Sequence, residues 1–391
     1  MPASSLCILK GHIPLLSETF IESHIERLRG GKAVLYNFFP EYTFNGRQIR
    51  CFFTRRPLLR KLKRLLPAFI YGKIESRSYS SSLVVRDFLW AFFQQQRVNC
   101  ILAEYGFNGV DICPVARELG IPLVVHFHGH DAHREPDVAV YRDRFPAMFK
   151  YAHSIISVSN LMTEKLIQLG APPEKIVYNP YGAREYFFDV QPDYRPVLIA
   201  VGRFADIKAP YLTVAAFREV CRHNADARLV MIGDGPLLEC CRSLARTWNI
   251  HQRIEFTGPL NHQQFLPRLS QARAFVQHSV TTSYGDAEGT PNSILEAQAA
   301  ALPVISTRHA GINEAVVSGT TGLLVDERDV DGMAQAMLQL LGNESFARKL
   351  GTAARDHIRR NYSIQRHIDV LQQCVDAATE TASGACRRWG Q

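Results

Sequence analysis

The stretch from Glu288 to Glu296 places two carboxylates on either side of a turn that leads into a helix. The residues between them include glycine, proline and serine, and the alanine-rich run that follows is typical of a helix interior. Backbone N–H groups at a helix N-terminus, together with the helix dipole, favour an anion such as a diphosphate. Glu296, about one helical turn inside, is placed to accept hydrogen bonds from vicinal hydroxyls of the same ligand. The alternative is that Glu288 and Ser293 only cap the helix, which we disfavour because a cap requires neither the second glutamate nor the glycine.

Two cations belong to the same half of the chain. Arg203 and Lys208 follow the apolar run PVLIAVG, at the carboxyl end of a predicted strand. Open parallel sheets bind their ligands at that edge. Arginine offers a forked donor and lysine a point charge, and both suit a departing diphosphate. Two cations in a loop are more often ordinary surface residues, so their significance comes from lying at the same predicted sheet edge as the Glu288 segment.

A third group is the histidine-rich run HFHGHDAH, which follows the predicted strand IPLVV. Its polar members are His126, His128, His130, Asp131 and His133. Alternating histidines at a strand end are plausible zinc ligands, although the order differs from the H-x-H-x-D-H of metallo-hydrolases. In a strand, the first two histidines share one face. We favour a substrate-facing histidine over a metal site because imidazole supplies donor, acceptor and proton-shuttle options near neutral pH.

Other motifs are weaker or missing. Asp329 and Asp331 form a D-x-D, but a helical pattern follows directly, so helix capping is the favoured explanation. The sequence has no G-x-G-x-x-G, Walker or G-x-S-x-G pattern. A nicotinamide dehydrogenase, a P-loop ATPase and an α/β-hydrolase are therefore disfavoured.

The elements that must position these residues follow a βα rhythm. Short apolar runs rich in β-branched residues alternate with amphipathic segments, which is typical of βαβ units and a parallel sheet. The runs are SLCILKG, KAVLYNF, NCILAEYG, IPLVVHFHG, HSIISVSN and KIVYNP in the first half, and PVLIAVG, ARLVMIG, RIEFTG, AFVQHS, PVISTR and GLLVDE in the second. We predict an α/β protein with two doubly wound domains, residues 1–190 and 191–361, and a linker within 179–196.

Composition agrees with this organisation. The 391 residues are 46% hydrophobic and 21% charged, enough for about two globular domains. The N-terminal apolar patch is too short for a signal peptide, and no uncharged apolar stretch reaches the roughly 18 residues of a membrane span. The nine cysteines include no C-x-x-C, which argues against a disulfide framework and a zinc module and fits a reducing cytoplasm.

The formal net charge of +8 leaves nucleic acid, an anionic membrane or a phosphorylated ligand as partners. Residues 55–73 carry seven positive charges and no acid, with leucines at helical spacing. Two interpretations stay open. The segment is either a helix that lies on an anionic leaflet or an ordinary surface helix with its apolar stripe on the core. Contact with lipid would account for much of the positive charge.

The chain resembles the retaining, GT-B-fold glycosyltransferases of family four. The resemblance covers nearly the whole length and rests on VGRF with Lys208, on MIGDGPLLE, on FTG, on the E-x7-E from Glu288 to Glu296 and on GLLVDERD. The segments AEYG and GIPLVVHFHGHD resemble the subgroup that builds colanic acid and related bacterial exopolysaccharides or lipopolysaccharides. This resemblance implies two Rossmann-like domains facing a central cleft, with a C-terminal helix, about 362–391, crossing back onto the first domain.

The resemblance also implies roles for individual residues. Arg203 and Lys208 would bind the diphosphate, Glu296 the ribose hydroxyls, and His128 and Glu288 would be catalytic residues at the donor sugar. The implied remaining donor contacts are Gly289, Thr290, Pro291, Asn292 and Ser293 for the sugar and phosphates, and Thr257 and Gly258 near the base. Glu18 and Asp131 are predicted on the acceptor side, although the first loop lacks the glycine pair of many relatives.

The implied reaction is transfer with retention of configuration, from a UDP- or GDP-sugar to a glycan or lipid-linked acceptor, without a metal or other cofactor. We expect a cytoplasmic protein, peripheral to the inner face of the plasma membrane if 55–73 touches lipid, and no nucleic-acid partner. Three alternatives stay open: a sugar-nucleotide epimerase of the same fold, a non-catalytic subunit of a polysaccharide assembly complex, and a metallohydrolase built on the histidine run.

Overall fold

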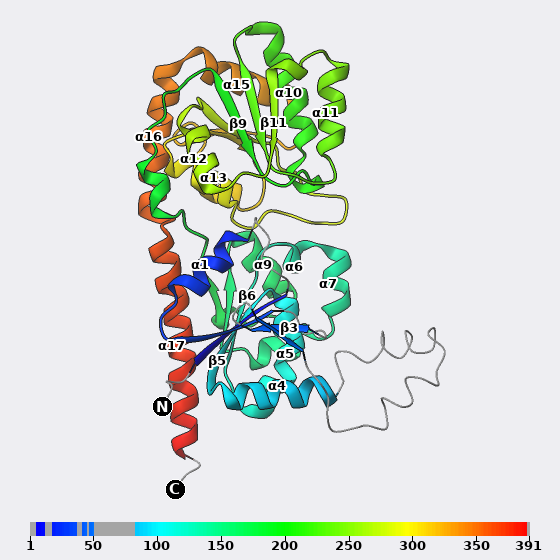
Figure 1. Ribbon diagram of the computed structural model, residues 1–391, viewed down its shortest axis with the longest axis vertical. Coiled ribbons are helices and arrows are strands. Elements are labelled where there is room, and N and C mark those ends of the chain that lie inside the picture. Colours follow the sequence, from blue (N-terminus) through cyan, green and yellow to red (C-terminus); the bar gives the residue numbers. More distant parts are fainter. Residues whose placement is uncertain (1–4, 12–17, 37–40, 45–46, 51–82, 389–391) are drawn as a thin grey trace, which may run out of the picture.

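A computed structural model describes residues 5–11, 18–36, 41–44, 47–50 and 83–388. The described residues form two α/β halves, each with its own sheet, stacked along the long axis of the molecule (Figure 1). This confirms the predicted fold class of two Rossmann-like units. The basic segment 55–73 lies outside the described residues.

The first sheet has eight strands in the order β4-β3-β2-β1-β5-β6-β7-β8. They are β1 (Ser5–Lys10), β2 (Gly31–Tyr36), β3 (Glu41–Phe44), β4 (Arg47–Arg50), β5 (Val98–Glu104), β6 (Leu123–His126), β7 (Ser154–Ser157) and β8 (Ile176–Tyr178). Each apolar run predicted in this half forms a strand, and all of these pair in parallel. The antiparallel β3–β4 hairpin at the edge was not predicted.

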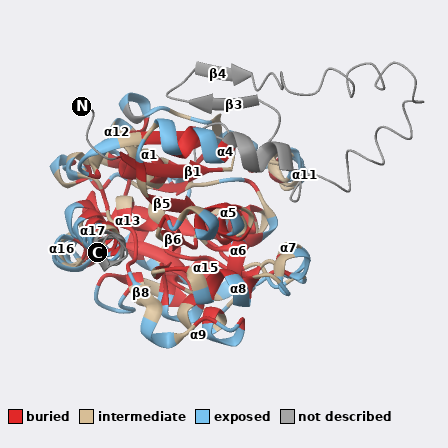
Figure 2. Ribbon diagram, turned by 90° about the horizontal axis from the view of Figure 1, so that it is seen from below, coloured by how far each residue is buried: buried red, intermediate tan, exposed pale blue. Residues whose placement is uncertain are grey.

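Helices flank this sheet and cover its apolar faces (Figures 1 and 2). They are α1 (Thr19–Arg27), α4 (Leu83–Gln95), α5 (Gly106–Leu119), α6 (His130–His133), α7 (Glu135–Tyr141), α8 (Phe145–Tyr151) and α9 (Asn160–Gln168). Strands β1 and β6 are buried along their entire length. Burial on both faces explains why these strands are near-continuous apolar runs rather than alternating ones.

The second sheet has six parallel strands in the order β11-β10-β9-β12-β13-β14. They are β9 (Val197–Val201), β10 (Arg228–Ile232), β11 (Ile254–Gly258), β12 (Ala274–Gln277), β13 (Val304–Thr307) and β14 (Gly322–Val325). Its helices are α10 (Pro210–His223), α11 (Leu238–Thr247), α12 (His262–Ser270), α13 (Asn292–Ala299), α14 (Ile312–Ala315), α15 (Val330–Gly342) and α16 (Glu344–Asn361). Every predicted run of this half is a strand.

Each sheet has one point where the chain order reverses. In the first sheet this point lies between β1 and β5, and in the second between β9 and β12. The loops that leave neighbouring strands at such a point diverge to opposite faces and open a crevice at the carboxyl ends of the strands. A ligand site is therefore expected at β1–β5 and at β9–β12.

The last helix, α17 (Ile364–Arg388), returns from the second half along the side of the first, as predicted (Figure 1). Its apolar side chains Ile364, Ile368 and Leu371 pack into a cluster with Leu102 and Val124 of the first sheet. At its start, Ala183 forms a parallel bridge with Ser363. The C-terminal segment is therefore a structural part of the first half.

No helix in the described part of the chain is long and apolar enough to cross a membrane.

The parallel bridge between Ala183 and Ser363 brings two segments close together and gives a stability prediction. A Cβ atom on Gly182 would overlap the backbone of Ser363 and Ile364, which no side-chain movement can relieve. Gly182→Ala should therefore lower the free energy of unfolding by about 1–3 kcal/mol, as overpacking does. Gly342→Ala is the control because a Cβ there meets nothing within 4 Å. Denaturant unfolding of both variants measures the difference. Equal midpoints would contradict the close packing of Gly182 against Ser363 and Ile364.

Candidate active site

A cleft of about 440 Å³ lies where the two reversal points face one another. Residues from both halves line it. The first half contributes Gly11, Glu18, Thr19, Phe20, Tyr105, Phe107, Asn108, His128, Gly129, His130 and Tyr181. The second contributes Val201, Gly202, Arg203, Ile207, Lys208, Asp286, Ala287, Glu288, Gly289, Thr290, Pro291, Asn292, Ser293 and Glu296. The structure therefore brings most of the predicted site residues together.

Glu288 and Lys208 form an ion pair in the cleft, with 2.8 Å between the carboxylate and ammonium groups. The hydroxyl of Ser279 donates to the same carboxylate oxygen over 3.2 Å. Burial alone would raise the pKa of Glu288, but the Lys208 charge and these hydrogen bonds hold the pKa below its ordinary value. Glu288 is therefore an anion whose partner cation comes from the opposite side of the reversal point.

Helix α13 presents an N-terminus without a side-chain cap. Its N-cap residue is Pro291, and no side chain in the described part of the chain caps it. Ser293 instead donates to Gln277 over 3.1 Å, and Thr290 donates to the Val158 carbonyl of the first half. The alternative that Glu288 and Ser293 only cap this helix is therefore wrong. Asp329, by contrast, accepts from the Gly332 N–H at 2.8 Å and caps α15, as predicted for the D-x-D.

His309, which was not predicted from the sequence, holds the backbone of the Glu288 segment by a hydrogen bond. Its Nε2 accepts the backbone N–H of Glu288 at 3.1 Å, and its Nδ1 lies 2.6 Å from the Glu327 carboxylate. Accepting at Nε2 and donating at Nδ1 defines one neutral tautomer. Glu327 also accepts from the backbone and hydroxyl of Thr281. The motif GLLVDERD thus contributes Glu327 as the residue that orients His309.

Glu296 differs from Glu288 in its surroundings. It is half-buried in the cleft wall, where burial raises the pKa of its carboxyl to about 8 and the charge of Arg184 opposes that rise. Arg203 lies exposed at the cleft rim and forms no ion pair with any other described residue. The cleft therefore holds a neutral acid at Glu296 and an exposed guanidinium at Arg203.

On the first-half wall, Glu18 is 3.0 Å from the buried Lys10 ammonium and accepts from the Tyr105 hydroxyl at 2.8 Å. Glu18 thus lies in the cleft, where it was predicted. Asp131 does not line the cleft: it is fully buried and accepts the backbone N–H groups of Gly106, His128 and Gly129. Its three backbone hydrogen bonds fix the shape of the loop. The structure therefore does not place Asp131 on the predicted acceptor side of the cleft.

The histidine run does not converge on one point. The rings of His126 and His128 share a face, as their spacing predicts, with 4.4 Å between centroids. His130 lies at the cleft, whereas His133 is buried and burial lowers its pKa to about 4. The four-histidine metal site that the sequence suggested does not form.

Thr257 and Gly258 end the edge strand β11 and are not among the cleft-lining residues. The Thr257 hydroxyl donates to the Gly258 carbonyl over 2.7 Å. Their predicted position near a nucleotide base stays a prediction.

Two family models match the chain. Residues 41–182 match the glycosyl transferase 4-like domain, and residues 195–343 match the glycosyl transferases group 1. The chain belongs to this glycosyltransferase family. The predicted family resemblance and the assignment as a transferase are confirmed.

Relatives and solved structures agree with the family. The putative colanic acid biosynthesis glycosyltransferase WcaL of Salmonella typhimurium is 28% identical over 285 residues, which is 70% of each chain. The amylovoran biosynthesis glycosyltransferase AmsK of Erwinia amylovora is 25% identical and covers 78% of this chain and 76% of its own. The crystal structure of Anabaena HepE with UDP superposes with a TM-score of 0.72 at 13% identity, covering 96% of this chain and all (100%) of that one. At 13% identity, the similarity to HepE shows a shared fold and nothing more.

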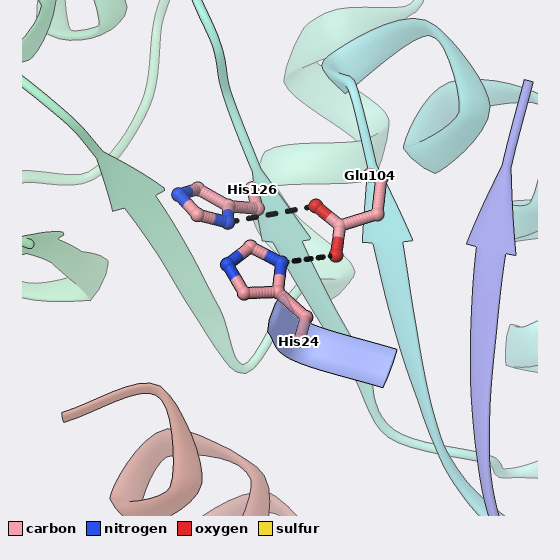
Figure 3. Close-up of side chains that lie close together, drawn as sticks. All are labelled: His24, Glu104 and His126. Atoms are coloured by element: carbon pink, nitrogen blue, oxygen red, sulfur yellow. Dashed lines mark hydrogen bonds and ion pairs between the residues drawn. The ribbon is translucent and has the colours of Figure 1, made fainter. Parts of the chain in front are cut away.

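One further cluster of this glycosyltransferase contains three potential metal ligands (Figure 3). His24, Glu104 and His126 are buried in the first half, and each offers one ligand atom within 4.8 Å of the others. His24 lies 2.7 Å from Glu104, a hydrogen-bond distance, whereas two ligands of a tetrahedral zinc with bonds of about 2.0–2.1 Å lie roughly 3.3 Å apart. The geometry favours a hydrogen-bonded cluster over a metal centre.

The raised pKa of Glu296 gives a second prediction. An acid whose pKa rises from 4.5 unfolded to about 8 folded binds a proton in the folded state that the unfolded state has released. Its contribution to stability is present below pH 4.5 and is lost as the pH rises to about 8. Glu296→Gln should therefore raise the free energy of unfolding at pH 9 by about 2–3 kcal/mol relative to wild type, with no gain near pH 4.

Thermal and denaturant unfolding between pH 4 and pH 9 tests this expectation. Glu239→Gln is the matched control in the same half: its side chain is 70% accessible and pairs only at the surface with Arg242, so its loss should change stability by less than about 1 kcal/mol, with no gain at pH 9. A pH-independent difference between wild type and Glu296→Gln would contradict the assignment.

Proposed function

We propose that this glycosyltransferase moves a sugar, with retention of configuration, from a nucleotide-diphosphate sugar to a glycan or lipid-linked acceptor. By analogy with WcaL and AmsK, the product would enter bacterial exopolysaccharide or lipopolysaccharide assembly. The observation that carries the proposal is the uncapped N-terminus of α13 beside the Lys208–Glu288 pair, in one cleft between the two halves.

The diphosphate would occupy the α13 N-terminus, where free N–H groups and the helix dipole favour it. The Lys208 ammonium would turn from Glu288 to a phosphate oxygen, and Arg203 would contact the diphosphate from the rim. Glu288, no longer paired with Lys208, would accept hydrogen bonds from hydroxyls of the donor sugar. The vicinal ribose hydroxyls would donate to Glu296 one helical turn inside.

In the transfer step, the bond between the anomeric carbon and the leaving phosphate breaks while the acceptor oxygen bonds to the same face of that carbon. Negative charge then grows on the nucleotide diphosphate, where Arg203, Lys208 and the helix dipole are preorganised to stabilise it. The leaving phosphate would take the proton of the acceptor hydroxyl. With two cations and a helix terminus for the leaving charge, we propose that the reaction needs no metal.

The donor and acceptor are proposed from related proteins and from the cleft. HepE is described in complexes with UDP and with UDP-glucose, and a mannosyltransferase relative from Mycolicibacterium smegmatis, 27% identical over 256 residues, is GDP-mannose-dependent. The first-half wall offers the rings of Phe20, Tyr105 and Phe107 beside Glu18 and Asn108. Aromatic faces with nearby acceptors and donors suit a sugar ring, so we place the acceptor glycan there.

Product analysis with a panel of UDP- and GDP-sugars tests the function itself. Transfer to a glycan acceptor is the expected outcome. Formation of an epimer without any acceptor would support the epimerase alternative, and binding without turnover by wild type would support a non-catalytic subunit.

Lys208→Ala and Arg203→Ala should each lower kcat by roughly 100-fold, because each removes one charge that stabilises the leaving diphosphate. Lys349→Ala is the matched control, since Lys349 is an exposed lysine of α16 outside the cleft. Steady-state rates with the donor that wild type consumes measure the effect. Wild-type rates in both cleft variants would contradict the assignment of the diphosphate site.

We also propose that the enzyme works at the cytoplasmic face of the membrane and that residues 55–73 contact anionic lipid. The support is the sequence alone: seven cations, no acid and leucines at helical spacing. Replacing Arg60, Lys61, Lys63 and Arg64 by glutamate should abolish co-sedimentation with phosphatidylserine vesicles at low salt. Neutral phosphatidylcholine vesicles are the control, and unchanged sedimentation of the variant with anionic vesicles would contradict the proposal.

A further inference from the structure

A buried chain of hydrogen bonds runs from the cleft wall to the C-terminal helix. His128 Nε2 lies 2.9 Å from one oxygen of Glu104, and His24 Nδ1 lies 2.7 Å from the other. His24 Nε2 lies 2.8 Å from His367 Nε2 on α17, whose Nδ1 is 2.9 Å from the Pro180 carbonyl. The four side chains come from β5, α1, α17 and the loop after β6, and they are almost completely buried.

The protons along this chain can be placed from its carbonyl end. A carbonyl only accepts, so His367 Nδ1 carries a proton. Burial and the neighbouring His24 hold the pKa of His367 well below its ordinary value, so its other nitrogen is an acceptor. His24 must then donate from Nε2.

The ionisation of Glu104 determines whether Nδ1 of His24 donates or accepts the hydrogen bond between them. Burial alone would raise the pKa of Glu104, but the neighbouring His24 and the hydrogen bonds from His24 and His128 hold it well below its ordinary value. An ionised carboxylate only accepts, so Nδ1 of His24 donates to Glu104 while Nε2 donates to His367.

The second oxygen of Glu104 fixes His128. It accepts from Nε2, which leaves the Nδ1 lone pair to accept the Tyr181 hydroxyl at 2.5 Å. The ring of His128 is thus held at both nitrogens in this structure. What His128 presents to the second half is its backbone.

That backbone lies against the Ala287–Gly289 segment. A Cβ on Gly289 would lie 2.9 Å from the His128 carbonyl oxygen, and one on Gly129 would lie 3.7 Å from the Ala287 carbonyl and the Gly289 N–H. A displacement of His128 would therefore displace the segment that precedes α13.

We propose that Glu104 is a positioning residue for sugar transfer: by holding His128, it holds the His128–Gly129 turn against the Ala287–Gly289 segment, while His24 donates to Glu104 and to His367. This inference rests on the proposed function only in assigning that segment to the donor sugar. Glu104 itself does not line the cleft and reaches it through His128.

Two substitutions separate positioning from folding. Glu104→Leu removes both acceptors and should lower kcat roughly 30- to 100-fold, the effect of a displaced reacting group. Glu104→Gln keeps the shape: its oxygen accepts from His128 and its amide donates to a neutral His24, so kcat should return to within about fivefold of wild type. Both variants should bind UDP or GDP within about twofold of wild type, because the nucleotide contacts lie in the other half.

The control is Glu22→Gln on the same helix as His24, since the one ion pair of Glu22 among the described residues is with the Lys10 ammonium at 3.4 Å. The substrate is whichever of UDP-glucose and GDP-mannose wild type consumes. Full activity of Glu104→Leu would overturn the proposal, as would a Glu104→Gln variant no better than Glu104→Leu.

Histidine ¹⁵N NMR of the wild-type protein at pH 7.5 is independent of activity and of any variant. We expect His24 with both nitrogens protonated and His128 protonated at Nε2 only, and we expect His24 to lose one proton in Glu104→Gln. A singly protonated His24 in wild type, or stoichiometric zinc in the purified protein by elemental analysis, would overturn the proton assignment. If wild type consumes no nucleotide sugar, the proposed function fails, and the NMR result still decides the arrangement of protons.

Discussion

Everything in the cleft depends on two parallel sheets presenting their carboxyl ends to each other. A parallel sheet binds ligands only at that edge, where the loops diverge at the reversal of chain order. Here the β1–β5 edge meets the β9–β12 edge, and most residues that line the cleft follow these strands. The exceptions in the first half are His128 to His130, which follow β6, and Tyr181, which follows β8. Helix α17 helps to hold the arrangement because it belongs to the second half in sequence and to the first in packing.

Direct contacts across the cleft fix the arrangement more finely. The Thr290 hydroxyl donates to the Val158 carbonyl, and Gly129 lies beside the backbone of Ala287 and Gly289. These contacts involve backbone and small residues, so the two halves approach closely without filling the space that a donor sugar needs. Thr290 was predicted as a donor contact, and in this structure its hydroxyl serves the contact between the halves.

The sequence was sufficient for features written in local patterns. The strands follow from apolar runs, and Lys208 and Glu288 meet because each follows a strand at the same sheet edge. Residues that act through distant partners were not predictable. His24 and His367 are 343 residues apart, and no local pattern indicates that their rings touch. Asp131 was predicted on the acceptor side, and only coordinates show that three backbone N–H groups occupy its carboxylate.

The two glutamates of the E-x7-E show why spacing alone could not assign their protonation. Lys208 and Ser279 stabilise the anionic form of Glu288, whereas burial favours the neutral form of Glu296. One motif thus supplies an anion near the proposed sugar position and a neutral acid near the proposed ribose. The difference comes from residues outside the motif, which a single sequence does not place in space.

The buried His24–Glu104 pair needs a reason other than stability. Removing two charges from water is costly, and apolar replacements of such pairs are often neutral or stabilising. What the pair provides is one defined arrangement of hydrogen bonds, in which each ring nitrogen from His367 to His128 has a single role. Because His367 lies on α17, this arrangement can form only after the C-terminal helix has docked. The C-terminal helix is therefore a necessary part of the wall that faces the Ala287–Gly289 segment.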